Sequence, residues 1–127
     1  METISPNGIY LDAMKMDFHE LVRVLIDNVG ATVVQTMAGV RDRTSPYEWA
    51  KPDGPIPGRS EVIARVRLGY QVWRTLEHSQ GPDVALAWLM GSNPRLNDGL
   101  PVLYIQRQLG QEVLGAAEAF VHDTFAA

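Results

Sequence analysis

The residues WLMGSNPRLNDGLPVLYIQRQLG, numbers 88–110, carry a dense series of helix start and stop signals. Gly91 is placed to end a preceding helix in the left-handed conformation, which glycine adopts at the least cost. Asn93 followed by Pro94 is typical of an N-cap and the first residue of a helix. This part of the chain therefore predicts a helix end followed at once by a short helical turn.

The second half of the same stretch repeats the pattern. Asp98 and Gly99 predict the end of the short turn, with Gly99 in the left-handed conformation. Pro101 predicts the start of another helix, and Gly110 is placed to end it. We therefore expect a compact set of short helices held in tight turns.

Helical signals cover most of the remaining chain. Asp17 and Glu20 form an arrangement of the capping-box kind, and the apolar residues after them recur at three- and four-residue spacing. No stretch alternates like a half-buried strand for more than about four residues. The predicted fold class is all-α, with a loose arm over residues 1–15 and helices over residues 17–29, 32–39, 45–50, 60–78, 82–90 and 111–124. The alternative for the arm is that Ile9, Tyr10, Leu11 and Met14 pack on the body or on a second subunit.

Two of these helices have further start signals. Thr32 with Gln35 predicts a second capping box, and Ser45, Pro46 and Glu48 predict an N-cap, a first helical residue and an acid at the third position. We likewise expect Ser60 to be the N-cap of the long helix that follows.

Residues 51–58, KPDGPIPG, contain three prolines and two glycines and predict a rigid bend. The bend either separates two parts, residues 1–58 and residues 59–127, or is a surface loop that joins helices of one domain.

The composition is ordinary for a folded protein. The chain has 127 residues, of which 46% are hydrophobic and 20% charged, enough for one domain or two very small ones. It has no cysteine, so disulfides and thiolate metal sites are excluded. No apolar run is long enough to span a bilayer, and the first residues lack the features of a signal peptide. We expect a cytoplasmic protein with no membrane partner.

The charge is unevenly distributed along the chain, whose net charge is −4. Residues 41–74 carry seven basic and four acidic side chains, a net charge of +3, whereas residues 75–127 carry two basic and six acidic ones, a net charge of −4. A basic middle between acidic ends predicts a local anion-binding surface, or else only solvated helix faces. Nine of the eleven basic residues are arginines, whose planar fork suits phosphates and guanine edges.

Enzymatic chemistry has little support in the sequence. His19, His78 and His122 lie far apart along the chain, and no H-E-x-x-H, P-loop or dinucleotide-binding motif occurs. A histidine near a helix end commonly interacts with the helix dipole, which requires no catalytic role. We expect a protein that is not an enzyme and that has no catalytic residue, metal or cofactor.

An ordered pattern covers the chain from about residue 81 to its end: a Trp-Leu pair, an Asn-Pro turn, a Leu, a Gly, a Pro and a late Leu-Gly. The residues that carry it are Trp88-Leu89, Asn93-Pro94, Leu96, Gly99, Pro101, Leu109-Gly110 and Val113. This combination resembles the C-terminal toxin-binding domain of antitoxins of the Xre/MbcA/ParS type. The resemblance implies a protein that neutralises a RES-domain toxin, a class of enzyme that consumes NAD. The competing interpretation is a helical bundle with well-marked turns and no partner.

A second resemblance covers the short helices before the bend. They follow the order helix, Gly-Val turn, then a helix whose Trp packs inward, and this order resembles the helix-turn-helix of the Xre class. The residues that carry it are Gly30, Thr32, Gly39-Val40, Thr44 and Trp49. The candidate recognition helix is short and is followed by Pro52, which departs from the family's pattern.

The two resemblances imply two sets of contact residues. In a helix-turn-helix, the recognition helix presents its N-terminal residues to base edges while nearby cations meet phosphates. The candidate DNA-binding residues are Arg41, Arg43, Ser45, Tyr47 and Lys51. In the antitoxin family, the C-terminal domain covers the toxin's NAD-binding cleft, and an acidic tail suits that role. The candidate toxin-binding residues are Asn93, Arg95, Asn97, Asp98, Arg107, Asp123 and Phe125.

The sequence therefore predicts an antitoxin with an N-terminal helix-turn-helix-like part and a C-terminal toxin-binding part. It is expected to occlude the NAD-binding cleft of a RES-type toxin, to bind operator DNA of its own operon, and to form a homodimer or a larger hetero-oligomer with the toxin. One alternative is a stand-alone transcriptional regulator without a toxin partner. Another is a binding protein that has lost contact with DNA.

Overall fold

The computed structural model describes the backbone of residues 5–126 and the side chains of residues 5–123. The regular elements in this range are all helices: α1 (Pro6–Lys15), α2 (Phe18–Val29), α3 (Ala31–Ala38), α4 (Ser45–Ala50), α5 (Ser60–Gln80), α6 (Pro82–Met90), the 3₁₀ turn η1 (Pro94–Leu96), α7 (Pro101–Gln106) and α8 (Gly110–Ala126). The only β-type pairing among the described residues is an isolated bridge between Asn93 and Gly99. The prediction of an all-α fold is confirmed.

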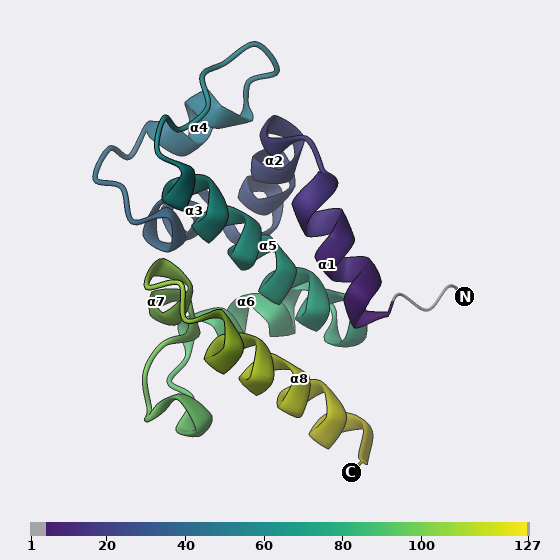
Figure 1. Ribbon diagram of the computed structural model, residues 1–127. Helices are drawn as coiled ribbons and strands as arrows, with labels where there is room; N and C mark the ends of the chain where they lie inside the picture. The colour runs from purple at the N-terminus through teal and green to yellow at the C-terminus, as the bar shows by residue number, and fades with distance from the viewer. Residues whose placement is uncertain (1–4, 127) are drawn as a thin grey trace.

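The long helix α5 is the element around which the others pack, as Figure 1 shows. It contacts α1, α2, α3, α6, α7 and α8. Its buried side chains include Val62, Val66, Tyr70, Trp73 and Leu76, which recur at three- and four-residue spacing, so one apolar stripe of α5 faces the other helices. The apolar core is one cluster that runs from Ala13 to Ala117 and draws on residues both before and after the bend at residues 51–58.

Several local predictions are confirmed by hydrogen bonds or helix bounds. The Glu20 amide donates to Asp17 Oδ2 at 3.1 Å, so Asp17 caps α2 as expected. Helix α6 begins at Pro82 and buries Ala85, Trp88 and Leu89. These features depend on residues close together in sequence, which is why local patterns identified them.

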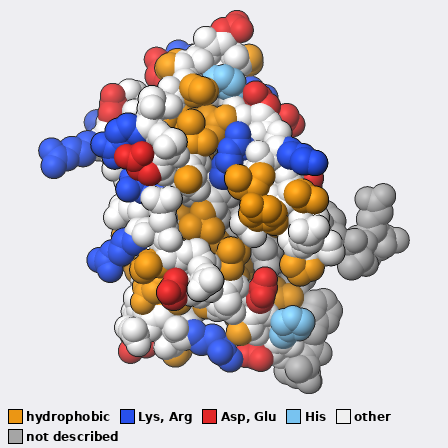
Figure 2. All heavy atoms as spheres, viewed as in Figure 1, with side chains coloured by type: hydrophobic (Ala, Val, Ile, Leu, Met, Phe, Trp, Pro, Cys, Tyr) orange, Lys and Arg blue, Asp and Glu red, His pale blue; other side chains and the backbone are white. Residues whose placement is uncertain are grey.

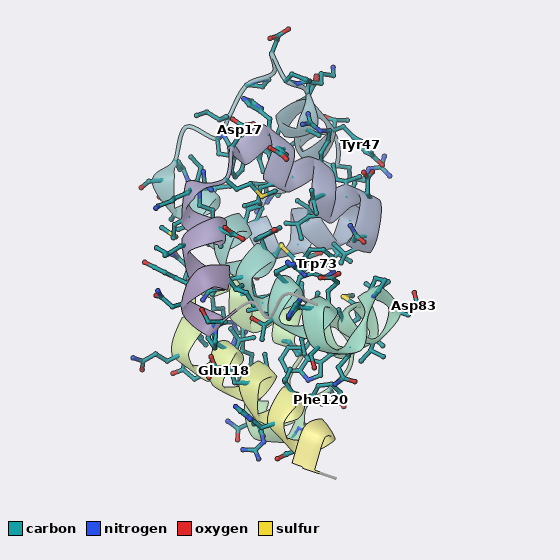
Figure 3. All side chains as sticks on the ribbon, turned by 90° about the vertical axis from the view of Figure 1, so that its right-hand side faces the viewer. Asp17, Tyr47, Trp73, Asp83, Glu118 and Phe120 are labelled. Atoms are coloured by element: carbon teal, nitrogen blue, oxygen red, sulfur yellow. The ribbon has the colours of Figure 1, made fainter. Side chains whose placement is uncertain are left out.

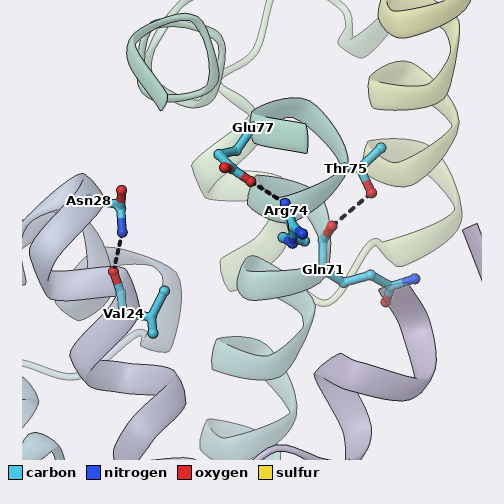
Figure 4. A network of polar contacts seen from close by, with 6 residues as sticks. All are labelled: Val24, Asn28, Gln71, Arg74, Thr75 and Glu77. Carbon is cyan, nitrogen blue, oxygen red and sulfur yellow. Dashed lines mark hydrogen bonds and ion pairs between the residues drawn. The ribbon is translucent and has the colours of Figure 1, made fainter. Parts of the chain in front are cut away.

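Short-range polar contacts also reinforce the C-terminal turns of α2 and α5 (Figure 4). Asn28 Nδ2 donates to the Val24 carbonyl at 2.8 Å, and Thr75 Oγ1 donates to a main-chain carbonyl one turn earlier at 2.8 Å. Arg74 forms an ion pair with Glu77 on the same helix. Each contact joins residues three or four positions apart, so these contacts lie within single helices and do not join separate ones.

The prediction of a loose arm over residues 1–15 is wrong for its described part. Ser5 Oγ accepts a hydrogen bond from the Gly8 amide at 3.0 Å, and α1 begins at the next residue, a proline. Ile9 and Ala13 are buried, and Arg67 Nη1 of α5 donates to the carbonyls of Ala13 and Met16 at 2.9 and 2.8 Å. The arm is a helix because α5 covers its narrow apolar side and caps its end, and neither contact leaves a strong periodic pattern in the sequence.

The predicted caps of α3, α4 and α5 are each shifted. Gly30, with φ of 92°, occupies the N-cap of α3, so Thr32 lies inside the helix and its expected capping box does not form. Thr44 rather than Ser45 precedes α4, and Arg59 rather than Ser60 precedes α5. In none of the three does the N-cap side chain accept a hydrogen bond from the helix.

Three glycine predictions in residues 88–110 are also wrong. Gly91 is extended, with φ of −100°, and Gly99 is not left-handed. The left-handed residues of that turn are Asn97 and Asp98. Gly110 begins α8 instead of ending α7, which ends at Gln106.

Candidate functional site

The two predicted sets of contact residues lie on two separate surfaces of the molecule. Figure 3 shows Tyr47, on α4, near one end of the molecule and Glu118, on α8, near the other. Helix α5 runs between these two groups of helices (Figure 1).

The turn between α6 and α7, residues 91–100, is held by hydrogen bonds within itself. The Asn93 amide donates to the Gly99 carbonyl at 3.0 Å, and the Asp98 amide donates to the Asn93 carbonyl at 2.9 Å. Asn93 Oδ1 accepts a hydrogen bond from the Arg95 amide at 2.9 Å, as predicted for an N-cap. Because the bonds close within a few residues, the turn has one defined shape.

The tip of this turn is strained and exposed. Asn97 and Asp98 have φ of 55° and 62°, and both side chains are exposed. Left-handed residues other than glycine are uncommon, and Asn and Asp are among those that tolerate the conformation best. Buried Leu96 anchors the tip, since its carbonyl accepts a hydrogen bond from the Tyr104 hydroxyl at 2.8 Å. The strained residues are therefore displayed from a fixed base.

The remaining toxin candidates are only partly brought together. Arg95 Nη2 lies 3.6 Å from Asp123 Oδ2, which links the turn to α8, although the two side chains are 60% and 71% exposed. An ion pair that exposed contributes little stability. Arg107 is exposed at the end of α7, and the Phe125 side chain lies outside the described residues. The structure thus groups Asn93, Arg95, Asn97, Asp98 and Asp123 on one surface.

The candidate DNA-binding residues surround the turn between α3 and α4, residues 39–44. Arg41 and Arg43 are exposed on the turn, and Tyr47 on α4 is 57% exposed. Lys51 follows α4 and pairs with Glu48, whereas Ser45, the first residue of α4, is partly buried. Figure 2 shows Lys and Arg side chains gathered where this turn lies in Figure 1.

An acidic residue within the basic turn has a structural role. Asp42 Oδ1 accepts hydrogen bonds from the Thr44 hydroxyl at 2.7 Å and from the Thr44 amide at 2.9 Å. These two bonds hold the pKa of the Asp42 carboxyl below its usual value. Asp42 thus shapes the turn just before α4 begins.

Sequence patterns did not identify the side chains that hold this turn in place. Gln35 Nε2 donates to the Val40 and Arg41 carbonyls at 3.2 and 3.1 Å. Arg65 Nη1 of α5 donates to the Ala38 carbonyl at 3.2 Å, and Gln106 Nε2 of α7 donates to the Thr36 carbonyl at 2.9 Å. Gln35 bonds carbonyls of the turn itself, whereas Arg65 and Gln106 bond carbonyls in the last turn of α3, where a helix leaves carbonyls without internal partners.

Gly39 is required where these side chains meet. It is left-handed, with φ of 73°, and ends α3 as predicted. A Cβ atom at this position would lie 3.1 Å from Arg65 Nη1 and 3.3 Å from Gln106 Cγ. Both the backbone conformation and the close approach of the two side chains therefore favour glycine.

The short helix α4 is also held from outside. A ring nitrogen of His19 on α2 lies 2.7 Å from the Trp49 carbonyl, and Arg23 Nη1 donates to the Ala50 carbonyl at 3.1 Å. Trp49 is buried and packs against Phe18, with ring centroids 6.0 Å apart. His19 therefore has a structural partner at the end of α4.

The described residues contain no group of three or more His, Cys, Asp or Glu side chains arranged to hold a metal ion. Nor does that part of the chain contain a helix long and apolar enough to cross a membrane.

Comparison with known proteins returned no match: no family model, no curated protein and no solved structure matches this chain.

Proposed function

We propose that this protein is an antitoxin that binds a RES-type toxin through the α6–α7 turn and α8, occludes the toxin's NAD-binding cleft, and binds operator DNA through the α3–α4 turn and α4. The observation that carries the proposal is the exposed left-handed pair Asn97-Asp98 on a turn closed by its own hydrogen bonds. Strained backbone at an exposed position is common at binding sites, where the surrounding structure maintains it.

The geometry of the turn suits a protein partner. Its shape is set before binding, so little conformational entropy is lost when a partner docks. Arg95 and Asp123 add one charge of each sign beside the tip, and both have most of their surface in water. They can therefore change partners from each other to groups on a toxin at small cost.

The DNA-binding half of the proposal rests on charge and exposure. Residues 41–74 have seven basic and four acidic side chains in a chain of net charge −4, so the positive potential is local. Arg41, Arg43 and Tyr47 project from one turn and the helix after it. A stand-alone regulator with no toxin would use this surface in the same way, and it remains the second candidate.

The test is co-expression with a RES-domain toxin encoded in the same operon. Arg95→Glu places a second negative charge beside Asp123 and removes a donor from the tip. We expect it to weaken toxin binding by about tenfold, or about 1.4 kcal/mol, and to reduce rescue of cell growth and of cellular NAD. Lys15→Glu is the matched control, because Lys15 is an exposed cation on α1.

Each result has a definite interpretation. Equal rescue by the Arg95→Glu and Lys15→Glu proteins removes the α6–α7 turn from the toxin interface. If the unchanged protein neither binds the toxin nor restores growth while it still binds promoter DNA, the stand-alone regulator is the correct function.

A further inference from the structure

A hollow of about 450 Å³ lies beside the α3–α4 turn. Its walls come from four segments: the turn itself, α4, the end of the bend that precedes α5, and the first turn of α5. Val40, Trp49 and Val62 contribute apolar lining, while Arg41 and Arg59 contribute the charged lining. Sequence patterns did not select Arg59 as a contact residue, because it comes to line the same hollow as Arg41 only through the packing of α5 against α3.

Both charged residues that line the hollow are arginines. Asp42 and Glu48 are not among the lining residues: Asp42 is bonded to Thr44, and Glu48 is paired with Lys51. Glu61 lies 3.1 Å from Arg59, but these side chains are 44% and 68% exposed, so this pair is weak and easily exchanged. Arg65 does not line the hollow, but its Nη1 bonds the Ala38 carbonyl next to Gly39, a lining residue, and so helps to hold that wall in place.

We propose that this hollow binds a backbone phosphate of duplex DNA, with Arg41 and Arg59 as its two phosphate ligands. Two guanidinium groups match the oxygens of a phosphate better than point charges do. The apolar lining suits the sugar that accompanies a phosphodiester. The hollow is also continuous with the exposed Arg41, and Arg43 and Tyr47 follow in the same segment, so the surface extends beyond the size of a single free anion. The inference rests on the DNA-binding half of the proposed function.

The experiment measures fluorescence anisotropy of a labelled duplex of random sequence as the salt concentration varies. Because each neutralised phosphate contributes about 0.9 to the slope of log K against log salt, we expect Arg41→Ala and Arg59→Ala each to reduce the slope by about one unit. The double variant should lose about two units. Lys15→Ala, which removes an exposed cation from α1, should leave affinity and slope unchanged.

Arg59→Lys distinguishes a phosphate ligand from a general charge effect. It should keep most of the salt slope, because the positive charge remains, but bind more weakly than the unchanged protein, because the planar fork is lost. Circular dichroism melts of each variant check that these exposed positions do not alter folding.

Other outcomes overturn the inference. If Arg41→Ala and Arg59→Ala bind with unchanged affinity and slope, the hollow is not a phosphate site, whereas promoter binding and toxin neutralisation stay intact. If Arg41→Ala and Arg59→Ala weaken the binding of inorganic phosphate but leave duplex affinity and its salt slope unchanged, the hollow takes free phosphate instead of DNA. If the unchanged protein binds no duplex at about 50 mM salt, both the phosphate site and the proposed DNA binding are wrong. Toxin neutralisation then remains a separate test of the proposed toxin binding.

Discussion

The two exposed turns of this protein, residues 39–44 between α3 and α4 and residues 91–100 between α6 and α7, are stabilised in different ways. The α6–α7 turn is closed by main-chain bonds and by the Asn93 side chain, within about ten residues of sequence. The α3–α4 turn has local bonds from Thr44 to Asp42, but the end of α3 that leads into it is also bonded by Arg65 and Gln106, which come from other helices.

The difference has a consequence for how each surface responds to change elsewhere. A turn closed by its own backbone keeps its shape when a neighbouring helix shifts. A turn held by α5 and α7 moves with those helices. Helix α7 directly follows the candidate toxin-binding turn and bonds the end of α3 through Gln106. We therefore expect a displacement of α7 to move the α3–α4 turn.

The largest expected effect is on the α6–α7 turn. A Cβ atom on Gly99 would lie 3.0 Å from the Leu96 carbonyl oxygen and 3.0 Å from a ring carbon of Tyr104. We expect Gly99→Ala to destabilise the protein by about 1–3 kcal/mol through overpacking, measured by urea unfolding. Gly115→Ala is the control: nothing lies within 4 Å of that added Cβ in the middle of α8, so stability should rise by about 0.5–1 kcal/mol.

A Gly99→Ala protein as stable as the unchanged chain would show that the turn can open to accept a side chain. The α6–α7 turn would then be less rigid than its hydrogen bonds indicate, and the contrast between the two turns would weaken.

A smaller effect is expected at the α3–α4 turn. Gln106→Ala removes the bond from Nε2 to the Thr36 carbonyl, which should cost about 1 kcal/mol. The amides of Gly39 and Val40, which both donate to the Gln35 carbonyl, should exchange faster with solvent, whereas the Asp98 amide should not change. Gln111→Ala, at an exposed position of α8, is the matched control. Unchanged exchange at residues 39 and 40 would mean that α7 does not hold this turn.

The smallest expected effect is on the pKa of Asp42 and on the pH dependence of stability that follows from it. The Thr44 hydroxyl and amide keep the pKa of Asp42 below its usual value, so the folded state favours the ionised carboxylate. The resulting stabilisation is present above the ordinary carboxyl pKa of about 3.9 and is lost as the pH falls through the lowered value. An NMR titration should show that Thr44→Val raises the pKa of Asp42, while Thr32→Val leaves it unchanged. A normal Asp42 pKa in the unchanged protein would contradict this assignment.

Much of the helical framework could be predicted from the sequence. Asp17 and Asn93 form the expected side-chain caps, α6 and α7 begin at the expected prolines, and the apolar stripe of α5 is buried. Caps, prolines and periodic apolar residues act over one helical turn, so their effect is encoded within a few neighbouring positions.

The conformations of individual glycines were less predictable. Gly91 and Gly99 are not left-handed, and Asn97 and Asp98 take that conformation instead. A glycine in sequence indicates either a left-handed backbone or a close approach, and local pattern does not separate the two. At position 99, the close approach of the Tyr104 ring from α7 is what favours glycine, and the backbone is not left-handed.

The sequence by itself determined the all-α class, most helix starts, the exposed Asn93 turn and the basic character of residues 41–74. The tertiary structure decided that the first described residues form a helix against α5, that Gln106 reaches Thr36 across a separation of 70 residues, and that Arg59 lines the same hollow as Arg41. The physical reason is the sequence separation of the interacting residues. Capping and periodicity act between neighbours in the chain, whereas these contacts form only when helices distant in sequence pack together.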